Sequence, residues 1–313
     1  GFDTSAADYQ DGLSGFLDGC KSLRTVTLGP KFAFEGAGLD RQCSLPAPSG
    51  DGLTGRWVNA STGVAYAPDS IPSNTKATYT AQTTESFEGW SQNGGCIWRV
   101  DDKGCLTVKP LPGAETGQLG KWLGNDAPWR SQTSAIKSVV IEKGVIAGQR
   151  LDNMFYGCSN LVSADLSGLS TSSTTSMESM FRGCTSLESL DISRFDTSKV
   201  TNMFAMFNNC PSLESLDLSS FDTSNVTTMW VMFGGCSSLK TLTFSSRFDT
   251  SNVENMDMMF AGCTALTALD VSGFNTSKAK TMRYMFSNCK SLTSLDVSSF
   301  DTSKVIGNSG PQY

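Results

Sequence analysis

Two recurring columns of side chains could do chemistry. A cysteine returns at steps of 26, 26, 26, 27 and 26 residues, and an aspartate column follows the same steps. The cysteines are Cys158, Cys184, Cys210, Cys236, Cys263 and Cys289. The second column reads Asp165, Asp191, Asp217, Thr243, Asp270 and Asp296. Stacked thiols could form disulfides, and stacked carboxylates could bind hard cations or polyols, or act as a glycosidase pair.

Other chemistry is excluded by composition. The 313 residues include no histidine, which removes Ser-His-Asp and Cys-His catalysis, histidine-containing zinc sites and histidine proton shuttles. No phosphate-binding Gly-rich loop, Gly-x-Ser-x-Gly elbow or Cys-x-x-Cys pair is found. The balance of 24 basic and 30 acidic residues gives no basic surface for nucleic acid, and no apolar run is long enough for membrane insertion. We therefore expect no enzyme activity.

The period that carries these columns predicts the fold. A fixed repeat of this length is typical of a solenoid, because each unit is too small to bury its apolar face alone. In one unit Leu213, Leu216 and Leu218 have the spacing of a strand in a leucine-rich repeat, and Val200, Met203, Met206 and Phe207 fall close to one face of a short helix. The sequence predicts an α/β solenoid with parallel inner strands and short outer helices.

Between strand and helix, the phrase Phe-Asp-Thr-Ser at 195–198 recurs at 221, 248 and 300, and as Phe-Asn-Thr-Ser at 274–277. Aspartate and serine oxygens accept hydrogen bonds from free backbone N–H groups, so we expect a buried Phe followed by a cap. We expect each recurring cysteine to be an unpaired thiol that fills a crowded turn, with disulfides as the alternative. Cys96 and Cys105 flank a hairpin whose register does not favour a bridge.

The phrases Met-Phe-x-x-Cys-x-Ser-Leu-x-x-Leu-Asp and Phe-Asp-Thr-Ser-x-Val resemble the BspA-like leucine-rich repeats of bacterial surface proteins. The resemblance covers residues 151–305, with an isolated copy at 20–28. Residues 95–108, 127–129 and 136–141 look like the β-cap that precedes such an array, and 55–59 with 79–82 look like a segment that closes one. The resemblance implies display outside the cell, a role in adhesion or host contact, and no catalytic residues.

This organisation predicts four parts. They are residues 1–54, the end of a first array with an irregular tail; 55–82, a closing β segment; 83–150, a β-rich cap; and 151–313, a truncated solenoid. Residues 1–5 repeat the mid-repeat phrase, so we expect the chain to be a fragment of a longer protein, with any signal or anchor elsewhere.

Two surfaces are candidates for ligand binding. The first is the aspartate column on the strands, with Asp191, Asp217, Asp270 and Asp296 as its candidates. Rungs about 4.8 Å apart would make a strip about 24 Å long. In one interpretation, the aspartates accept hydrogen bonds from neighbouring hydroxyls and keep the face soluble. In the other, the strip binds polyols or calcium, with Asp191 and Asp217 as calcium ligands. No other cofactor is expected.

The second surface is the variable pair of each repeat. The pairs are Asp152-Asn153, Glu178-Ser179, Phe204-Ala205, Trp230-Val231, Asp257-Met258 and Arg283-Tyr284. The helical pattern places at least the first residue of each pair outward. Phe204, Trp230 and Tyr284 could then form an exposed aromatic patch for a partner, or could fill grooves between helices.

We therefore expect a surface-displayed, non-enzymatic module that binds a host extracellular protein or a glycan. We expect it to be a monomer without nucleic-acid partners. A structural spacer that displays another domain is the alternative. A carbohydrate-active enzyme with paired carboxylates is a more distant one.

Overall fold

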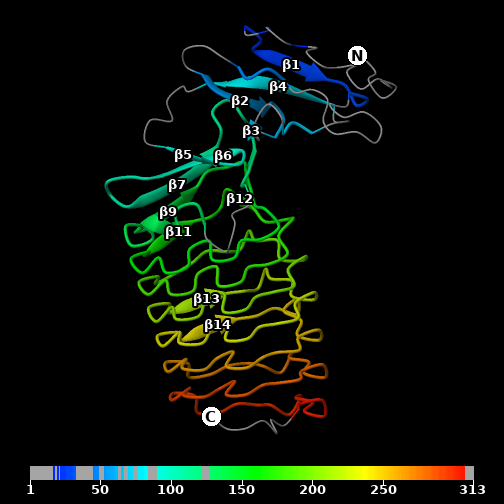
Figure 1. The fold of residues 1–313 in the computed structure, drawn as a ribbon. Helices are drawn as coiled ribbons and strands as arrows, with labels where there is room; N and C mark the ends of the chain where they lie inside the picture. The colour runs from blue at the N-terminus through cyan, green and yellow to red at the C-terminus, as the bar shows by residue number, and fades with distance from the viewer. Residues whose placement is uncertain are drawn as a thin grey trace, which may run out of the picture. The chain divides into compact units, whose positions relative to one another are not determined.

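The chain forms two compact units, residues 1–98 with 109–120 and residues 99–108 with 121–313 (Figure 1). The computed structural model describes residues 17, 20, 22–32, 45–48, 53–62, 65–66, 70–72, 76–83, 90–120 and 127–306. The repeated phrase at 1–5, much of the expected tail before residue 54 and the last residues from 307 lie outside the described residues. The four-part organisation stays a prediction.

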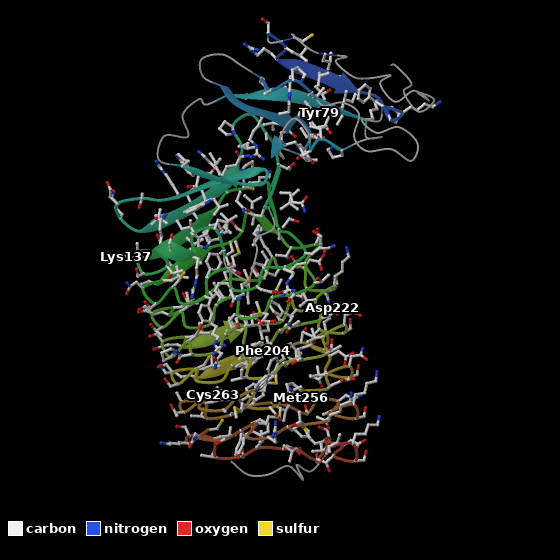
Figure 2. All side chains as sticks on the ribbon, viewed as in Figure 1. Tyr79, Lys137, Phe204, Asp222, Met256 and Cys263 are labelled. Atoms are coloured by element: carbon white, nitrogen blue, oxygen red, sulfur yellow. The ribbon has the colours of Figure 1, made fainter. Side chains whose placement is uncertain are left out.

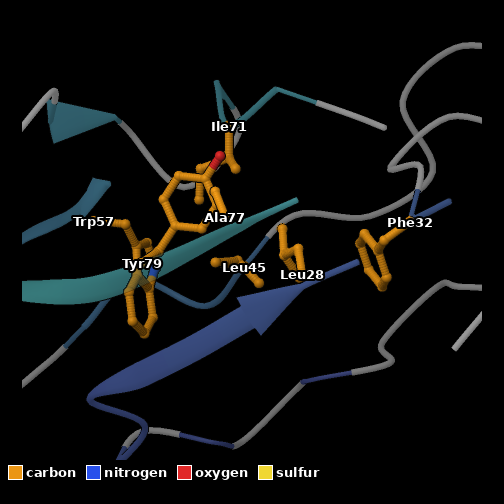
Figure 3. Packing of buried hydrophobic residues seen from close by; sticks show 7 residues of the cluster. All are labelled: Leu28, Phe32, Leu45, Trp57, Ile71, Ala77 and Tyr79. Carbon is orange, nitrogen blue, oxygen red and sulfur yellow. The ribbon is translucent and has the colours of Figure 1, made fainter. Parts of the chain in front are cut away.

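The first unit contains an antiparallel sheet with the order β1-β4-β2-β3. Its strands are β1 (Thr25–Leu28), β2 (Leu53–Asn59), β3 (Ala65–Tyr66) and β4 (Ala77–Thr83). A cluster of buried side chains packs on this sheet, and Trp57 and Tyr79 are its fully buried aromatic members (Figure 3). The indole nitrogen of Trp57 donates to the carbonyl of Pro46 over 2.9 Å. Two further strands pair antiparallel, β5 (Ser91–Asn93) and β6 (Cys96–Val100), and β8 covers Gly117–Gln118.

The second unit begins with a parallel ladder and continues as a solenoid. Strand β9 pairs in parallel with β7 on one side and β11 on the other. Each following repeat forms one rung, and Figure 1 shows the rungs as stacked loops from green to red. Its strands are β7 (Cys105–Pro110), β9 (Ser138–Ile141), β10 (Val145–Ile146), β11 (Ser163–Asp165), β12 (Leu169–Ser170), β13 (Ser215–Asp217) and β14 (Thr241–Thr243). β10 pairs in parallel with β12, and β13 with β14.

The solenoid core consists of columns of identical side chains. Met203, Met206, Phe207, Cys210 and Leu213 are all fully buried, as their spacing predicts. The phenylalanines stack from rung to rung with ring centroids 5.4–5.8 Å apart. This phenylalanine ladder is Phe155, Phe181, Phe207, Phe233, Phe260 and Phe286. Since each ring covers its neighbours, burial in one rung depends on the next.

The expected outer helices do not form in the described repeats. The backbone N–H groups of Met203, Ala205 and Phe207 donate to carbonyls of the next rung. Between them, Met206 and Asn208 donate to carbonyls three residues back in their own rung. In an α-helix every backbone N–H donates to the carbonyl four residues back. Here every second N–H donates to the next rung instead, so an α-helix cannot form. The only helical segment in the described chain is the 3₁₀ turn η1, Arg130–Gln132.

The Phe-Asp-Thr-Ser phrase forms a turn that links rungs. The Asp196 carboxylate accepts from the N–H and the hydroxyl of Ser198, which is the expected local cap without the helix. The buried Thr197 hydroxyl donates to the carbonyl of Asp222 in the next rung and accepts from the Asp222 N–H. Figure 2 shows Asp222 at the edge of the rungs opposite Lys137. One threonine per rung thus ties each turn to its neighbour.

Candidate functional site

The variable pairs carry a row of exposed apolar side chains on consecutive rungs. Trp230 is 43% exposed, Met258 37% and Tyr284 66%. The half-buried Phe204 lies against Trp230, with ring centroids 4.9 Å apart and a tilt of 43°. We call Phe204, Trp230, Met258 and Tyr284 the apolar row; Figure 2 labels Phe204 within the stack of rungs. Only Val162, Val297 and Ile306 are comparably exposed large apolar residues elsewhere in the described chain.

Backbone geometry presents this row. The second residue of every pair has a left-handed φ between 52° and 58°, including Ala205, Val231, Met258 and Tyr284. In every pair before the last, its N–H donates to the next rung; for example, the Val231 N–H donates to the carbonyl of Asp257 over 2.8 Å. The left-handed residue reverses the local path of the chain, so either member of a pair can project outward. The exposed residue is the first member of its pair at Trp230 and the second member at Met258 and Tyr284.

Two first members are buried, against the expectation that these positions point outward. Asp152 is 1% exposed and Asp257 is 3% exposed. Arg150 forms an ion pair with Asp152, and Arg283 donates to Asp257 from Nε and Nη2 over 3.0 and 2.8 Å. Asp257 also accepts from the hydroxyl of Thr281 and the Arg283 N–H. Asp257 thus joins the two rungs that carry Met258 and Tyr284 rather than facing solvent. Asp152 lies outside the apolar row and joins its rung to the next through the Ser176 hydroxyl and the Glu178 N–H.

Val231 is held in an unfavourable conformation at the centre of the row. A β-branched residue at φ 52° is strained, because Cβ crowds the backbone there. Gly234 provides the space: a Cβ at Gly234 would lie 2.4 Å from Cγ2 of Val231 and 3.2 Å from Nδ2 of Asn208. The same position carries Tyr156, Arg182 and Asn208 in earlier rungs. Val231 and Gly234 therefore form a matched pair beside Trp230.

The aspartate column lies on the exposed strand face. Each of its carboxylates accepts from the N–H of the serine two residues on, as Asp191 does from Ser193 over 3.0 Å and Asp217 from Ser219 over 2.8 Å. These backbone bonds, with the serine hydroxyls, lower the pKa of Asp191 and of Asp217. Asp270 and Asp296 make the same bond to Ser272 and Ser298. Within the described residues no three or more Cys, Asp or Glu side chains are grouped so that they could hold a metal ion.

The cysteine column is a second ladder inside the solenoid, beside the phenylalanine ladder. All six cysteines are free thiols, and Sγ of Cys210 donates to the carbonyl of Phe181 in the preceding rung over 3.1 Å. Cys184, Cys236, Cys263 and Cys289 repeat this bond. Burial raises the pKa of Cys158 and of Cys210 to about 12. Cys96 and Cys105 are also free, so the structure has the unpaired thiols that the sequence favours.

Comparison with known families identifies the repeats. The family described as "Mycoplasma protein of unknown function, DUF285" matches residues 149–245 and 216–310, together more than half of the chain. The chain belongs to the DUF285 family. The matched DUF285 region contains the apolar row, the phenylalanine ladder and the aspartate column. No curated protein matches the chain.

Three solved structures are similar to the DUF285 chain. A leucine-rich cell surface protein from Faecalibacterium prausnitzii is 17% identical, with 62% of this chain and 56% of that chain covered and a TM-score of 0.33. A leucine-rich repeat protein from Eubacterium ventriosum is 17% identical, with 65% of this chain and 76% of that chain covered and a TM-score of 0.27. A leucine-rich repeat protein from Bacteroides ovatus is 13% identical, with 60% of this chain and 57% of that chain covered and a TM-score of 0.33. This chain thus spans little more than half of two of these proteins. Because these TM-scores are low, the three structures do not assign the repeat motif of this chain. The BspA-like motif assignment stays a prediction.

The structure brings Phe204 and Trp230 together and leaves Tyr284 further along the same row. Met258, Val231 and Gly234 were not singled out from the sequence. The signal for Met258 was its place in a variable pair, but a helical register would have turned it away from Trp230. None of the helices in the described part of the chain is long and apolar enough to cross a membrane.

Proposed function

We propose that this chain is a non-enzymatic binding module that recognises a host extracellular protein or glycan through the apolar row. The observation that carries the proposal is the exposure of Trp230, Met258 and Tyr284 on consecutive rungs of a rigid stack. Large aromatic side chains are favoured anchors at binding surfaces, and contiguous exposed apolar area usually has a partner. A spacer would need no such row.

The row rests on a fixed base. Phe204 and Trp230 are in mutual contact, and the Arg283–Asp257 ion pair joins the two rungs that carry Met258 and Tyr284. Preorganised side chains lose little conformational entropy on binding. The strained Val231 next to Trp230 is also characteristic of a functional surface, since strain is kept where the surroundings enforce it for a purpose.

Display outside the cell belongs to this proposal and follows from the resemblance to BspA-like surface repeats. The buried thiols are compatible with it. Cys236 is fully buried and burial raises the pKa of its thiol well above the usual value, so the reactive thiolate is absent even in an oxidising environment. Stacked but free cysteines therefore do not argue for a reducing compartment.

The proposal is tested by binding to an array of host glycans and extracellular-matrix proteins. We expect at least one target to bind the unmodified chain. The double variant Phe204→Ser, Trp230→Ser should not bind that target. The matched control is Val162→Ser, which removes a similarly exposed apolar side chain, 46% against 43%, outside the row. All variants are compared at equal melting temperature. Binding by neither the chain nor the control would favour the spacer.

A further inference from the structure

A pocket of ≈ 450 Å³ opens on the strand face at the beginning of the solenoid, beside β9 and β11. Its volume lies in the range of about 300–1,000 Å³ that small-molecule sites occupy. The apolar part of its lining is Val139, Ala164, Leu166, Ile192 and Phe195. The polar part includes Asp165, Asp191, Arg194 and serine hydroxyls. The pocket is separate from the apolar row.

A small residue lines this pocket where the later rungs have a larger one. The parallel registers place Ala164 next to Val139, which is next to Leu106. In the later rungs the position of Ala164 is occupied by a leucine each time, at Leu190, Leu216, Leu242, Leu269 and Leu295. A buried leucine side chain contributes about 1.5–3 kcal/mol, so alanine gives up packing that the other rungs use. That loss has a reason if the space is for a ligand.

The polar lining favours a neutral ligand. Asp165 and Asp191 are carboxylates, and hydrogen bonds from Ser167 and Ser193 lower the pKa of each, so both are ionised at neutral pH. Arg194 brings a positive charge to the same lining. The residue before the corresponding phenylalanine in the later rungs is Ser220, Arg247, Gly273 or Ser299. A cation would meet Arg194 and an anion would meet the two aspartates. A hydroxyl group can donate to a carboxylate and accept from a guanidinium, so it satisfies both.

We propose that this pocket binds a neutral sugar residue. The C–H face of the sugar ring packs on Ala164, Ile192 and Phe195, and its hydroxyls bond Asp165, Asp191 and Arg194. The site binds without hydrolysing, because glycoside hydrolysis needs one carboxyl to hold a proton and neither aspartate does. This proposal is independent of the proposed binding role of the apolar row, so either of the two can be refuted without the other.

The test uses the methyl glycosides of glucose, galactose, mannose and N-acetylglucosamine, titrated at millimolar concentration by saturation-transfer NMR. Ala164→Leu restores the residue that the other rungs have and fills the pocket without loss of apolar burial. The matched control is Thr243→Asp, which also restores a column residue but lies outside the pocket lining. We expect at least one glycoside to bind the unmodified chain and the control equally. Ala164→Leu should weaken that binding at least about tenfold, with no fall in melting temperature.

Three results with the methyl glycosides, and a fourth with ionic probes, would overturn the proposal. One is that none of the glycosides binds the unmodified chain. Another is that Ala164→Leu binds as well as the control. The third is that Phe204→Ser, Trp230→Ser removes the binding, which would place the sugar on the apolar row and support only the other proposal. An alkylamine and glucose 6-phosphate serve as ionic probes, and binding of either in preference to every methyl glycoside also contradicts the neutral-sugar assignment.

Discussion

Truncation of the phenylalanine ladder at its centre should destabilise the protein far more than truncation near its end. Phe207 is fully buried, with the rings of Phe181 and Phe233 at 5.7 and 5.8 Å. Phe207→Ala removes the burial of one ring and two aromatic contacts, so we expect the free energy of unfolding to fall by about 3–5 kcal/mol. Phe286 is only partly buried and stacks on Phe260 at 5.6 Å. Phe286→Ala removes one aromatic contact instead of two. Its loss of unfolding free energy should therefore be smaller, by at least about 0.5–1.5 kcal/mol, which is what one aromatic pair contributes.

The measurement is equilibrium unfolding in urea, followed by far-UV circular dichroism on both variants and the unmodified chain. Because a solenoid can unfold rung by rung, hydrogen exchange at the Met180, Met206 and Met232 amides provides a local check. Faster exchange should extend from the Phe207 rung to both neighbours. Equal destabilisation by the two variants, or a loss below about 1 kcal/mol for Phe207→Ala, would refute nearest-neighbour stacking as the source of stability.

Four further results are expected. Gly234→Ala should lower stability by about 1–3 kcal/mol, since its Cβ would lie 2.4 Å from Cγ2 of Val231; Val231→Ala added to it should recover part of the loss in a thermal melt, and no recovery would reject the matched pair. Of the described cysteines, a thiol reagent should label exposed Cys20 in the native chain and leave buried Cys158, Cys184, Cys210, Cys236 and Cys263 unlabelled until unfolding; native labelling of these five would contradict their burial. The aspartate column has folded pKa values below the unfolded ones, so its contribution to stability is present above about pH 4 and is lost as the pH falls further; Asp217→Asn should melt with a weaker dependence on pH between about 5 and 3, and an unchanged dependence would contradict the serine bonds. Calcium at millimolar concentration should leave the melting temperature unchanged, because each aspartate already bonds its own serine; a rise would instead establish the calcium strip.

The repeat period was sufficient to predict the solenoid and its interior. Met203, Met206, Phe207 and Cys210 are buried as their spacing indicates, and Phe204 and Trp230 meet because they occupy the same position in adjacent rungs. These predictions depend only on the translation of one repeat onto the next. They hold whatever the local backbone conformation is.

The outer helices were predicted wrongly because the deciding hydrogen bonds are not local. Spacings of 3, 3 and 1 fit one face of a helix, but they fit equally well a chain whose alternate N–H groups donate to the next rung. Left-handed residues such as Ala205 and Val231 have no signature in their side chains that identifies the conformation. The burial of Asp257 was missed for the same reason, since its partner Arg283 becomes a neighbour only in the folded stack. Asp152 likewise accepts from the Ser176 hydroxyl and the Glu178 N–H, which the stack brings over from the next rung.

The apolar row as a recognition surface is tested most directly by oxidative footprinting of the chain with the target found on the array. We predict that a bound target protects Trp230, Met258 and Tyr284 from oxidation, while Val162 and Val297, exposed to 46% and 43%, react as in the free chain. Protection confined to other surfaces, with Trp230 and Met258 as reactive as before, would contradict the proposed site.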